Sequence, residues 1–148
     1  MPPSSPVGDL EVELTRLLRR ARSSQRRTAT EVHPDLDAAG YAVLVTIRDL
    51  SASGGGARGG DVSEALGLHK STTSHNLTTL EALGLVERVP DEDDARARQV
   101  RLTAEGREAL ERSVRGRRER LRRQLSTWDA ADIRELGRLL RQLNDTAP

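Results

Sequence analysis

The stretch that decides the fold runs from Gly59 to Thr103 and reads GGDVSEALGLHKSTTSHNLTTLEALGLVERVPDEDDARARQVRLT. It predicts a short helix, a tight turn at Gly67, a second helix that ends at Gly84, and a β-hairpin with charges at its tip. Glycine suits such a turn because it adopts positive φ without steric cost. This order of elements indicates a helix-turn-helix followed by a wing.

The second helix, which we expect to begin near His69 or Lys70, has two unlike sides. Its leucines at positions 77, 80 and 83 point inward, while short polar groups occupy the other side. An ordinary solvated face would usually carry Glu and Lys, and Ser and Thr lower helix propensity. Such a row of small hydrogen-bonding side chains suits the major groove of DNA. The predicted DNA contacts of this helix are Lys70, Ser71, Thr72, Ser74, His75, Thr78 and Thr79.

The wing is predicted to consist of two strands, 85–89 and 98–102, joined by the tip PDEDDARA. An arginine that a neighbouring carboxylate holds in place loses less entropy when it enters a narrow minor groove, and Asp94 is two residues from Arg96. The acidic run 91–94 lacks the spacing, the glycine and the distal Glu of a calcium-binding loop, so we expect a solvated tip. The predicted DNA contacts of the wing are Arg88, Asp94, Arg96 and Arg98.

Helices are predicted on both sides of this stretch, which gives a mainly α fold of the α+β class. Residues 1–8 are expected to be disordered, and Asp9 is expected to be the N-cap of a helix that reaches about Val32. Further helices are predicted at 37–50, at 103–125 and at 129–143, and the connector SASGGGARGG at 51–60 is predicted to be a flexible linker. The expected organisation is a disordered start (1–8), an N-terminal helix (9–36), a winged helix-turn-helix (37–103) and C-terminal helices (104–148).

Composition excludes several classes of protein. The chain has 148 residues, no Cys, and only two aromatic residues, Tyr41 and Trp128, so disulfides, thiolate metal sites and an aromatic platform for single strands are not expected. No apolar run approaches the length of a membrane span and the start lacks the apolar stretch of a signal peptide, so we expect a cytoplasmic protein without a membrane partner. His69 and His75 are six residues apart and do not share a helix face, so no metal or cofactor is expected. No nucleophile motif or carboxylate pair indicates an enzyme.

The wing resembles that of MarR-type transcription regulators, a bacterial family whose pattern is close to GLV-x-R, then D-x-R, then LT-x-x-G. The matching positions are Gly84, Leu85, Val86, Arg88, Asp94, Arg96, Leu102, Thr103 and Gly106. The helix order extends this resemblance over roughly residues 10 to 145. In the family, the arginine that matches Arg96 inserts in the minor groove, and the aspartate that matches Asp94 positions it. The position of His75 often carries Arg there.

The resemblance implies an obligate homodimer formed through the N- and C-terminal helices. The apolar stripe of the last helix fits this, because a chain with 35% hydrophobic residues has little core in which to bury it. The stripe could also pack against the first helix, and both uses are compatible. The predicted dimerisation residues are Leu10, Leu14, Leu17, Ile133, Leu136, Leu140 and Leu143.

The sequence therefore predicts a homodimeric, sequence-specific regulator of double-stranded DNA, a repressor with a pseudo-palindromic operator. The resemblance also implies a small-molecule effector, often an aromatic or phenolic acid, for which Tyr41, Arg16 and Arg20 are conceivable lining residues. The alternative is a winged-helix module that binds protein instead of DNA. The basic run RGRRERLRR at 115–123 is either a solvated helix face with pairs such as Glu119–Arg123 or a contact for phosphates.

Overall fold

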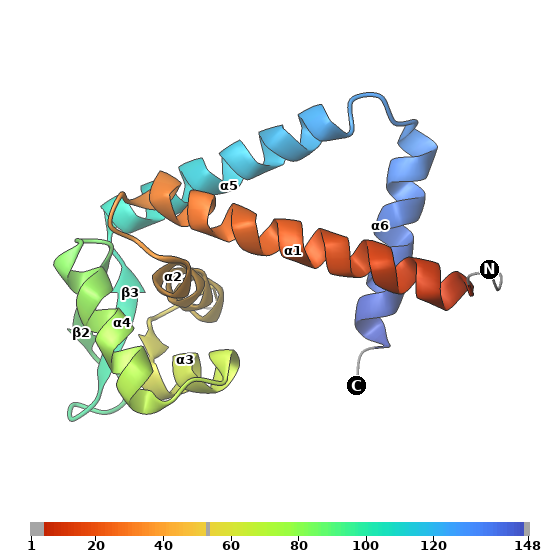
Figure 1. The fold of residues 1–148 in the computed structure, drawn as a ribbon. Coiled ribbons are helices and arrows are strands. Elements are labelled where there is room, and N and C mark those ends of the chain that lie inside the picture. The colour runs from red at the N-terminus through yellow and green to blue at the C-terminus, as the bar shows by residue number, and fades with distance from the viewer. Residues whose placement is uncertain (1–4, 53, 147–148) are drawn as a thin grey trace. The chain divides into compact units, whose positions relative to one another are not determined.

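A computed structural model describes residues 5–52 and 54–146 of the chain. The elements appear in the order α1 (Pro6–Val32), α2 (Ala38–Leu50), β1 (Ala57–Arg58), α3 (Gly59–Leu66), α4 (Lys70–Ala82), β2 (Val86–Pro90), β3 (Arg98–Leu102), α5 (Ala104–Gln124) and α6 (Ala130–Asp145) (Figure 1). They form two compact units, Met1–Ser113 and Val114–Pro148. The expected mainly α winged helix-turn-helix architecture is confirmed.

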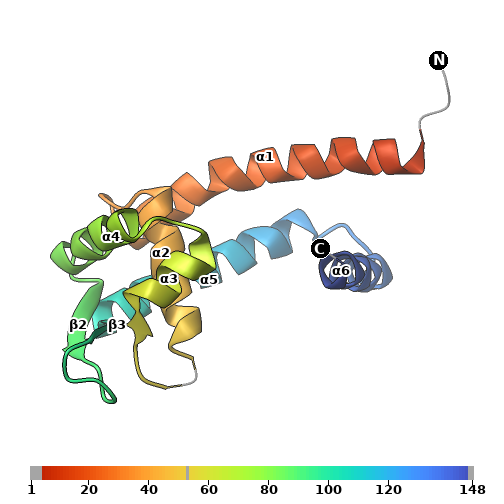
Figure 2. The ribbon, with the colours of Figure 1, turned by 90° about the horizontal axis from the view of Figure 1, so that it is seen from below.

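The first unit has one hydrophobic core, and α2 lies at its centre. Leu44 and Ile47 of α2 are fully buried, and α3, α4 and β3 all pack against this helix. Figure 2 shows α2, α3 and α4 gathered together beside the strands. The end of α1 belongs to the same core, because Ala29 and Val32 are buried in it. The C-terminal end of α1 is therefore part of the winged unit, and most of the rest of the helix is exposed.

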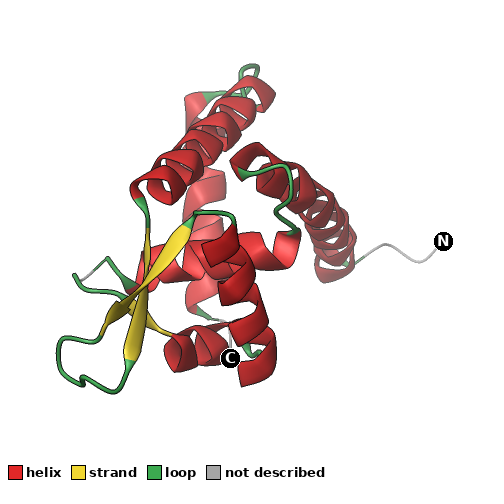
Figure 3. Ribbon diagram, turned by 90° about the vertical axis from the view of Figure 1, so that its left-hand side faces the viewer, coloured by secondary structure: helices red, strands yellow, loops and turns green. Residues whose placement is uncertain are grey.

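The sheet has three antiparallel strands in the order β1-β3-β2, visible in yellow in Figure 3. The hairpin register pairs Val86 with Leu102 and Pro90 with Arg98, close to the predicted strands. The prediction that 51–60 is only a linker is wrong, since Ala57 and Arg58 pair with Val100 and Gln99 of β3. A strand of two residues carries no alternation that a sequence pattern could reveal. Ala57 is buried beneath the sheet nonetheless.

The first helix begins earlier than expected. Its N-cap is Ser5, whose Oγ accepts a hydrogen bond from the backbone N–H of Gly8 at 3.1 Å, and Pro6 occupies the first helical position. Proline is well placed there because its ring presets a helical φ and the missing N–H has no helical partner to lose. Asp9 is therefore inside the helix, and residues 6–8 are helical. The remainder of the expected disordered segment, residues 1–4, lies outside the described residues.

One junction joins α4, the hairpin and α5. Gly84 follows α4 with a positive φ of 73°, and the N–H of Thr103 donates to the carbonyl oxygen of Leu85 at 3.1 Å. The Thr103 hydroxyl donates to the carbonyl oxygen of Gly84 at 2.6 Å and accepts from the N–H of Gly106 at 3.0 Å. A single hydroxyl thus caps α5 and ties it to the end of α4.

The second unit contains the C-terminal part of α5 and the whole of α6. None of the described residues of α6 is buried. Its leucines and isoleucine nevertheless recur at helical spacing on one side, where five large apolar side chains are 37 to 47% exposed: Ile133, Leu136, Leu139, Leu140 and Leu143. We call these five residues the α6 stripe.

Replacing Gly106 with Ala should destabilise the first unit. An added Cβ at this position would overlap the carbonyl oxygen of Leu85 and lie 2.8 Å from its carbonyl carbon, so backbone must move. Overpacking of this kind costs about 1–3 kcal/mol of unfolding free energy, measurable by urea denaturation.

Gly60→Ala is the matched control, because nothing lies within 4 Å of a Cβ there and Gly60 is also helical. That variant should be neutral or slightly stabilised. Equal stability losses in the two variants would contradict the account of the junction.

Candidate nucleic-acid interface

The polar face predicted for α4 is present and open to solvent. All seven predicted residues of this helix are exposed, while Leu77 and Leu80 are buried on its opposite side. Leu83, also predicted to point inward, is partly buried against the core. Within the described residues, no hydrogen bond holds the hydroxyls of Ser71, Thr72 or Ser74, so they are available to a ligand.

The helix-turn-helix is held by a buried polar contact that the sequence did not single out. Ser63 of α3 and Thr73 of α4 are both buried, and their hydroxyl oxygens lie 2.8 Å apart in a hydrogen bond. The turn between the helices uses Gly67 at φ 62°, and the N–H of Leu68 donates to the carbonyl oxygen of Ser63 at 2.9 Å. Ser63 Oγ also lies 3.0 Å from the carbonyl oxygen of Gly59, so both buried hydroxyls have partners, and their contact helps to set the angle between the two helices.

The C-terminal part of α4 has a different character. The hydroxyls of Thr78 and Thr79 donate to the carbonyl oxygens of Ser74 and His75, four residues earlier, at 3.0 and 3.1 Å. Beside them, Arg88 of β2 donates through Nε to Glu81 at 3.1 Å and through its terminal nitrogen to Thr78 at 3.4 Å. Arg88 thus lies next to the polar face, already engaged by a carboxylate.

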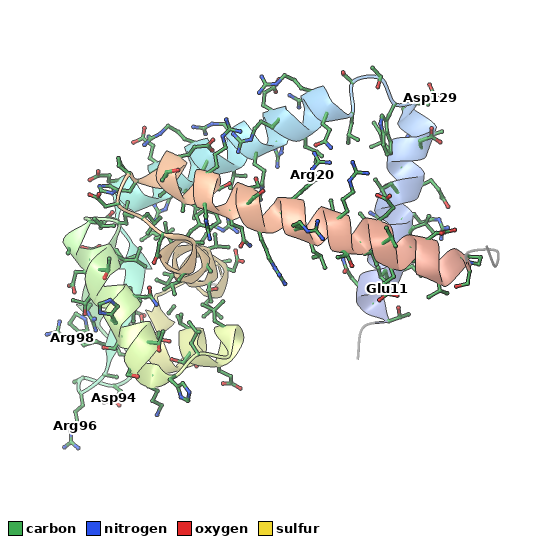
Figure 4. All side chains as sticks on the ribbon, viewed as in Figure 1. Glu11, Arg20, Asp94, Arg96, Arg98 and Asp129 are labelled. Carbon is green, nitrogen blue, oxygen red and sulfur yellow. The ribbon has the colours of Figure 1, made fainter. Side chains whose placement is uncertain are left out.

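The wing tip presents its arginines to solvent. Arg96 and Arg98 are exposed, and Figure 4 shows the Arg96 side chain extending past Asp94 and away from the body of the unit. Asp94 does contact Arg96, but its Oδ1 accepts from the backbone N–H at 3.0 Å. Among the described residues, no ion pair joins this carboxylate to the Arg96 guanidinium. Asp94 therefore positions the backbone beneath Arg96 and not the side chain itself.

The N-terminal end of α4 and the wing loop lie at the same end of the first unit. Figure 1 shows both at its lower edge, and Figure 2 shows them spaced apart across that edge. A helix and a hairpin loop arranged in this way can contact one elongated partner at two separate places.

Asp91, which we expected to be part of a solvated tip, is instead a buried carboxylate. Its Oδ2 accepts from Arg58 Nε at 2.7 Å and from Gln99 Nε2 at 3.1 Å. Its Oδ1 accepts from the backbone N–H groups of Asp93 and Asp94 at 2.9 and 3.2 Å. The Arg58 guanidinium, followed by these backbone donors, holds the pKa of the Asp91 carboxyl well below its usual range. Sequence reasoning missed both members of this pair, since 33 residues separate them.

The predicted dimerisation residues are exposed or partly exposed in the single chain. Leu10 and Leu17 of α1 are exposed, Leu14 is partly buried, and the other four belong to the α6 stripe. The basic run on α5 includes a pair between Arg122 and Glu119 at 2.8 Å, in place of the pair with Arg123 that we expected.

The three residues suggested as lining an effector site differ in their exposure to solvent. Tyr41 is buried in the core of the first unit, so it does not face solvent. Arg16 and Arg20 are exposed on α1, where Arg20 is labelled in Figure 4.

No group of three or more His, Asp or Glu side chains in residues 5–52 and 54–146 could hold a metal ion. Over the same ranges, no helix combines the length and the apolar character needed to cross a membrane.

A helix-turn-helix with an exposed polar second helix, followed by a hairpin with arginines at its tip, defines a winged helix-turn-helix protein. The model of the MarR family matches residues 37–97, from the N-cap of α2 to the wing tip. This segment is therefore a MarR family domain, and the resemblance drawn from the wing motif is confirmed. A comparison with curated proteins yields no match.

Solved structures share the fold over nearly the whole chain. A MarR family protein from Bacillus stearothermophilus superposes with a TM-score of 0.71 at 24% identity, over 93% of this chain and 94% of that one. RV1404 from Mycobacterium tuberculosis gives a TM-score of 0.82 at 18% identity, over 99% and 98%. MepR from S. aureus, as a variant bound to an oligodeoxyribonucleotide, gives 0.62 at 18% identity, over 90% and 96%. MepR bound to ethidium bromide gives 0.64 at 19% identity, over 89% and 94%.

The stability that Asp91 confers should depend on pH in acid. Because its folded-state pKa lies below the unfolded value of about 3.9, the carboxylate stabilises the fold above that value and loses its effect as the pH falls further. Wild type should therefore be more stable than Asp91→Asn at pH 7, and the difference should shrink between about pH 4 and about pH 2. Urea unfolding at each pH measures this.

Asp93→Asn removes the same charge from an exposed position and should show no such convergence. A stability difference between wild type and Asp91→Asn that stays constant down to about pH 2 would rule out the buried ion pair as its source.

Proposed function

We propose that the protein is a sequence-specific, double-stranded DNA-binding transcription regulator that acts as a homodimer without enzymatic activity. The observation that carries the proposal is the exposed polar face of α4, which the Ser63–Thr73 hydrogen bond joins to α3. The N-terminal end of this helix lies at the same end of the first unit as the wing loop that carries Arg96. In this arrangement α4 enters a major groove and Arg96 reaches the adjacent minor groove. The MepR variant, which shares the fold, is bound to an oligodeoxyribonucleotide.

The alternative, a winged-helix module that binds protein, is less well supported. A protein-binding face requires an exposed apolar patch. Between residues 54 and 120, however, no large hydrophobic side chain of the described chain is exposed. The exposed face of α4 carries Ser, Thr, His75 and Lys70 and no acidic side chain among its seven predicted contacts. Together with Arg96 of the wing, this face suits a polar and negatively charged partner.

The proposed self-association is supported by the apolar side chains that the single chain leaves in solvent. The α6 stripe and the leucines of α1 are exposed at helical spacing, and monomers seldom leave such continuous stripes uncovered. A two-fold dimer would present two α4 helices to DNA, and its operator would be pseudo-palindromic with half-sites about 10 base pairs apart.

We further propose that the protein is a repressor and that a small molecule lowers its affinity for DNA. An effector that binds one dimer geometry more tightly shifts the population toward it, and operator affinity falls when that geometry does not match the half-site spacing. MepR, similar in fold, is bound to ethidium bromide in one structure, so a fold of this kind accommodates an aromatic cation as well as the aromatic acids expected above.

Replacing Arg96 with Ala should weaken operator binding by about tenfold or more and lower the salt dependence of the affinity. A contact that displaces counterions contributes about 0.9 to the slope of log K against log salt, and a dimer would lose two. Fluorescence anisotropy with DNA from upstream of the gene, at several salt concentrations, measures both effects.

Arg101→Ala is the charge-matched control, because Arg101 is on β3 and pairs with Glu87 at 2.7 Å. Its affinity should change little. If Arg96→Ala bound the operator with unchanged affinity and slope, the assignment of the wing would be wrong.

Placing Glu at both Leu136 and Leu140 should convert the dimer to monomer. Each carboxylate would have to lose its hydration in the apolar interface. The free-energy cost of burying an unpaired charge exceeds the stabilisation that such an interface provides. Sedimentation velocity measures the change, with Gln142→Glu as a control on the same helix. Retention of the dimer by the double variant would exclude the α6 stripe from the interface.

A further inference from the structure

The Asp91 carboxylate joins both parts of its own hairpin to β1, which lies 33 residues earlier in the sequence. Arg58 of β1, Gln99 of β3 and the turn at 93–94 all donate to its two oxygens. Gln99 extends the network, because its Oε1 accepts from the backbone N–H of Gly56 at 2.9 Å. The wing is therefore fastened to the strand that precedes α3 and not only to its own hairpin partner.

A short chain of contacts leads from this carboxylate to Arg96. Oδ1 of Asp91 holds the N–H of Asp94, whose own carboxylate accepts the N–H of Arg96. The turn is closed by two backbone hydrogen bonds, from Asp91 N–H to Ala97 O at 3.1 Å and from Ala97 N–H to Asp94 O at 2.9 Å. The exposed loop between Asp91 and Ala97 is thus held by the buried Asp91 carboxylate together with the Asp94 side chain and two backbone hydrogen bonds.

Asp93 is a nearby carboxylate in the same loop that lacks the hydrogen bonds of Asp91. It is exposed, and none of the hydrogen bonds of the described residues involves its side chain. Near DNA both carboxylates repel phosphate, so removing either charge should favour binding if charge were the only effect. Any favourable effect of Asp91 on binding must therefore come from the contacts of its carboxylate and not from its charge.

We propose that Asp91 is a positioning residue for DNA binding, which sets the place of Arg96 through the turn at 93–94, with Arg58 as its counterion. This inference rests on the proposed function, specifically on DNA contact by Arg96. Asp91 itself does not touch DNA. Its effect is the reverse of what its charge would produce.

The test is a double-mutant cycle in the full chain with operator DNA, comprising wild type, Asp91→Asn, Arg96→Ala and the double variant. Asp91→Asn should weaken binding by about threefold or more, although it removes a negative charge. In the Arg96→Ala background the same change should have no effect or should strengthen binding slightly. Asp93→Asn, the charge-matched control, should bind as tightly as wild type or more tightly.

Arg58→Gln provides a second route to the same contact if Asp91→Asn folds poorly. Arg58 is half exposed, so Gln at this position disturbs no packed side chain, but it removes the counterion of the buried Asp91 carboxylate and thereby weakens the same contact. The Arg58→Gln defect should likewise shrink in the Arg96→Ala background. Backbone NMR of the free protein gives a readout without DNA, since the amides of Asp93 and Asp94 should lose protection from exchange in both variants.

The outcomes separate the two proposals. If Arg96→Ala weakens binding and Asp91→Asn does not, or weakens it equally in both backgrounds, the positioning role of Asp91 is overturned while the DNA-binding function stands. If wild type does not bind DNA at low salt, or Arg96→Ala leaves its affinity unchanged, the proposed function fails and the role of Asp91 falls with it.

Discussion

The winged unit depends on the close approach of α5 to the backbone that leaves α4. The Thr103 hydroxyl lies between the carbonyl of Gly84 and the amide of Gly106, and a side chain at Gly106 has no room beside Leu85. Both strands of the hairpin meet α4 and α5 here, so this contact determines the direction in which the hairpin leaves α4. The Gly84–Leu85, Thr103 and Gly106 parts of the wing motif are thus explained by packing alone, before any role in binding is considered.

Most of the fold could be predicted because its signals are periodic and local. The leucines of α4 and α6, the turn at Gly67 and the alternation of β3 all agree with the structure. The exceptions have physical causes. Strand β1 has two residues and follows a glycine-rich run, so its pairing with β3 depends on a partner more than 40 residues away. The start of α1 was placed at an aspartate, although serine followed by proline caps equally well.

The candidate site could be predicted where its signal is local in the sequence, and could not be predicted where it depends on contacts between separate elements. A helix face is a local pattern, so the exposed residues of α4 could be named from the sequence. The contacts that support this face could not, because Ser63 with Thr73, and Arg58 with Asp91, join separate elements. Nothing in the sequence distinguishes the four consecutive acidic residues at 91–94 from one another. In the structure Asp91 is 4% exposed and its three neighbours are exposed, which divides the run into one internal anchor and three surface charges.

The back-bonding of Thr78 and Thr79 affects which chemical groups α4 can meet. Each hydroxyl has one proton, and in both residues that proton points along the helix to a carbonyl oxygen. The Thr79 oxygen keeps both lone pairs, and the Thr78 oxygen keeps one beside the contact from Arg88 at 3.4 Å, so this part of the helix is an acceptor surface. Exocyclic amino groups of adenine and cytosine match such a surface directly. A guanine or thymine carbonyl would require the hydroxyl to rotate away from its helix first.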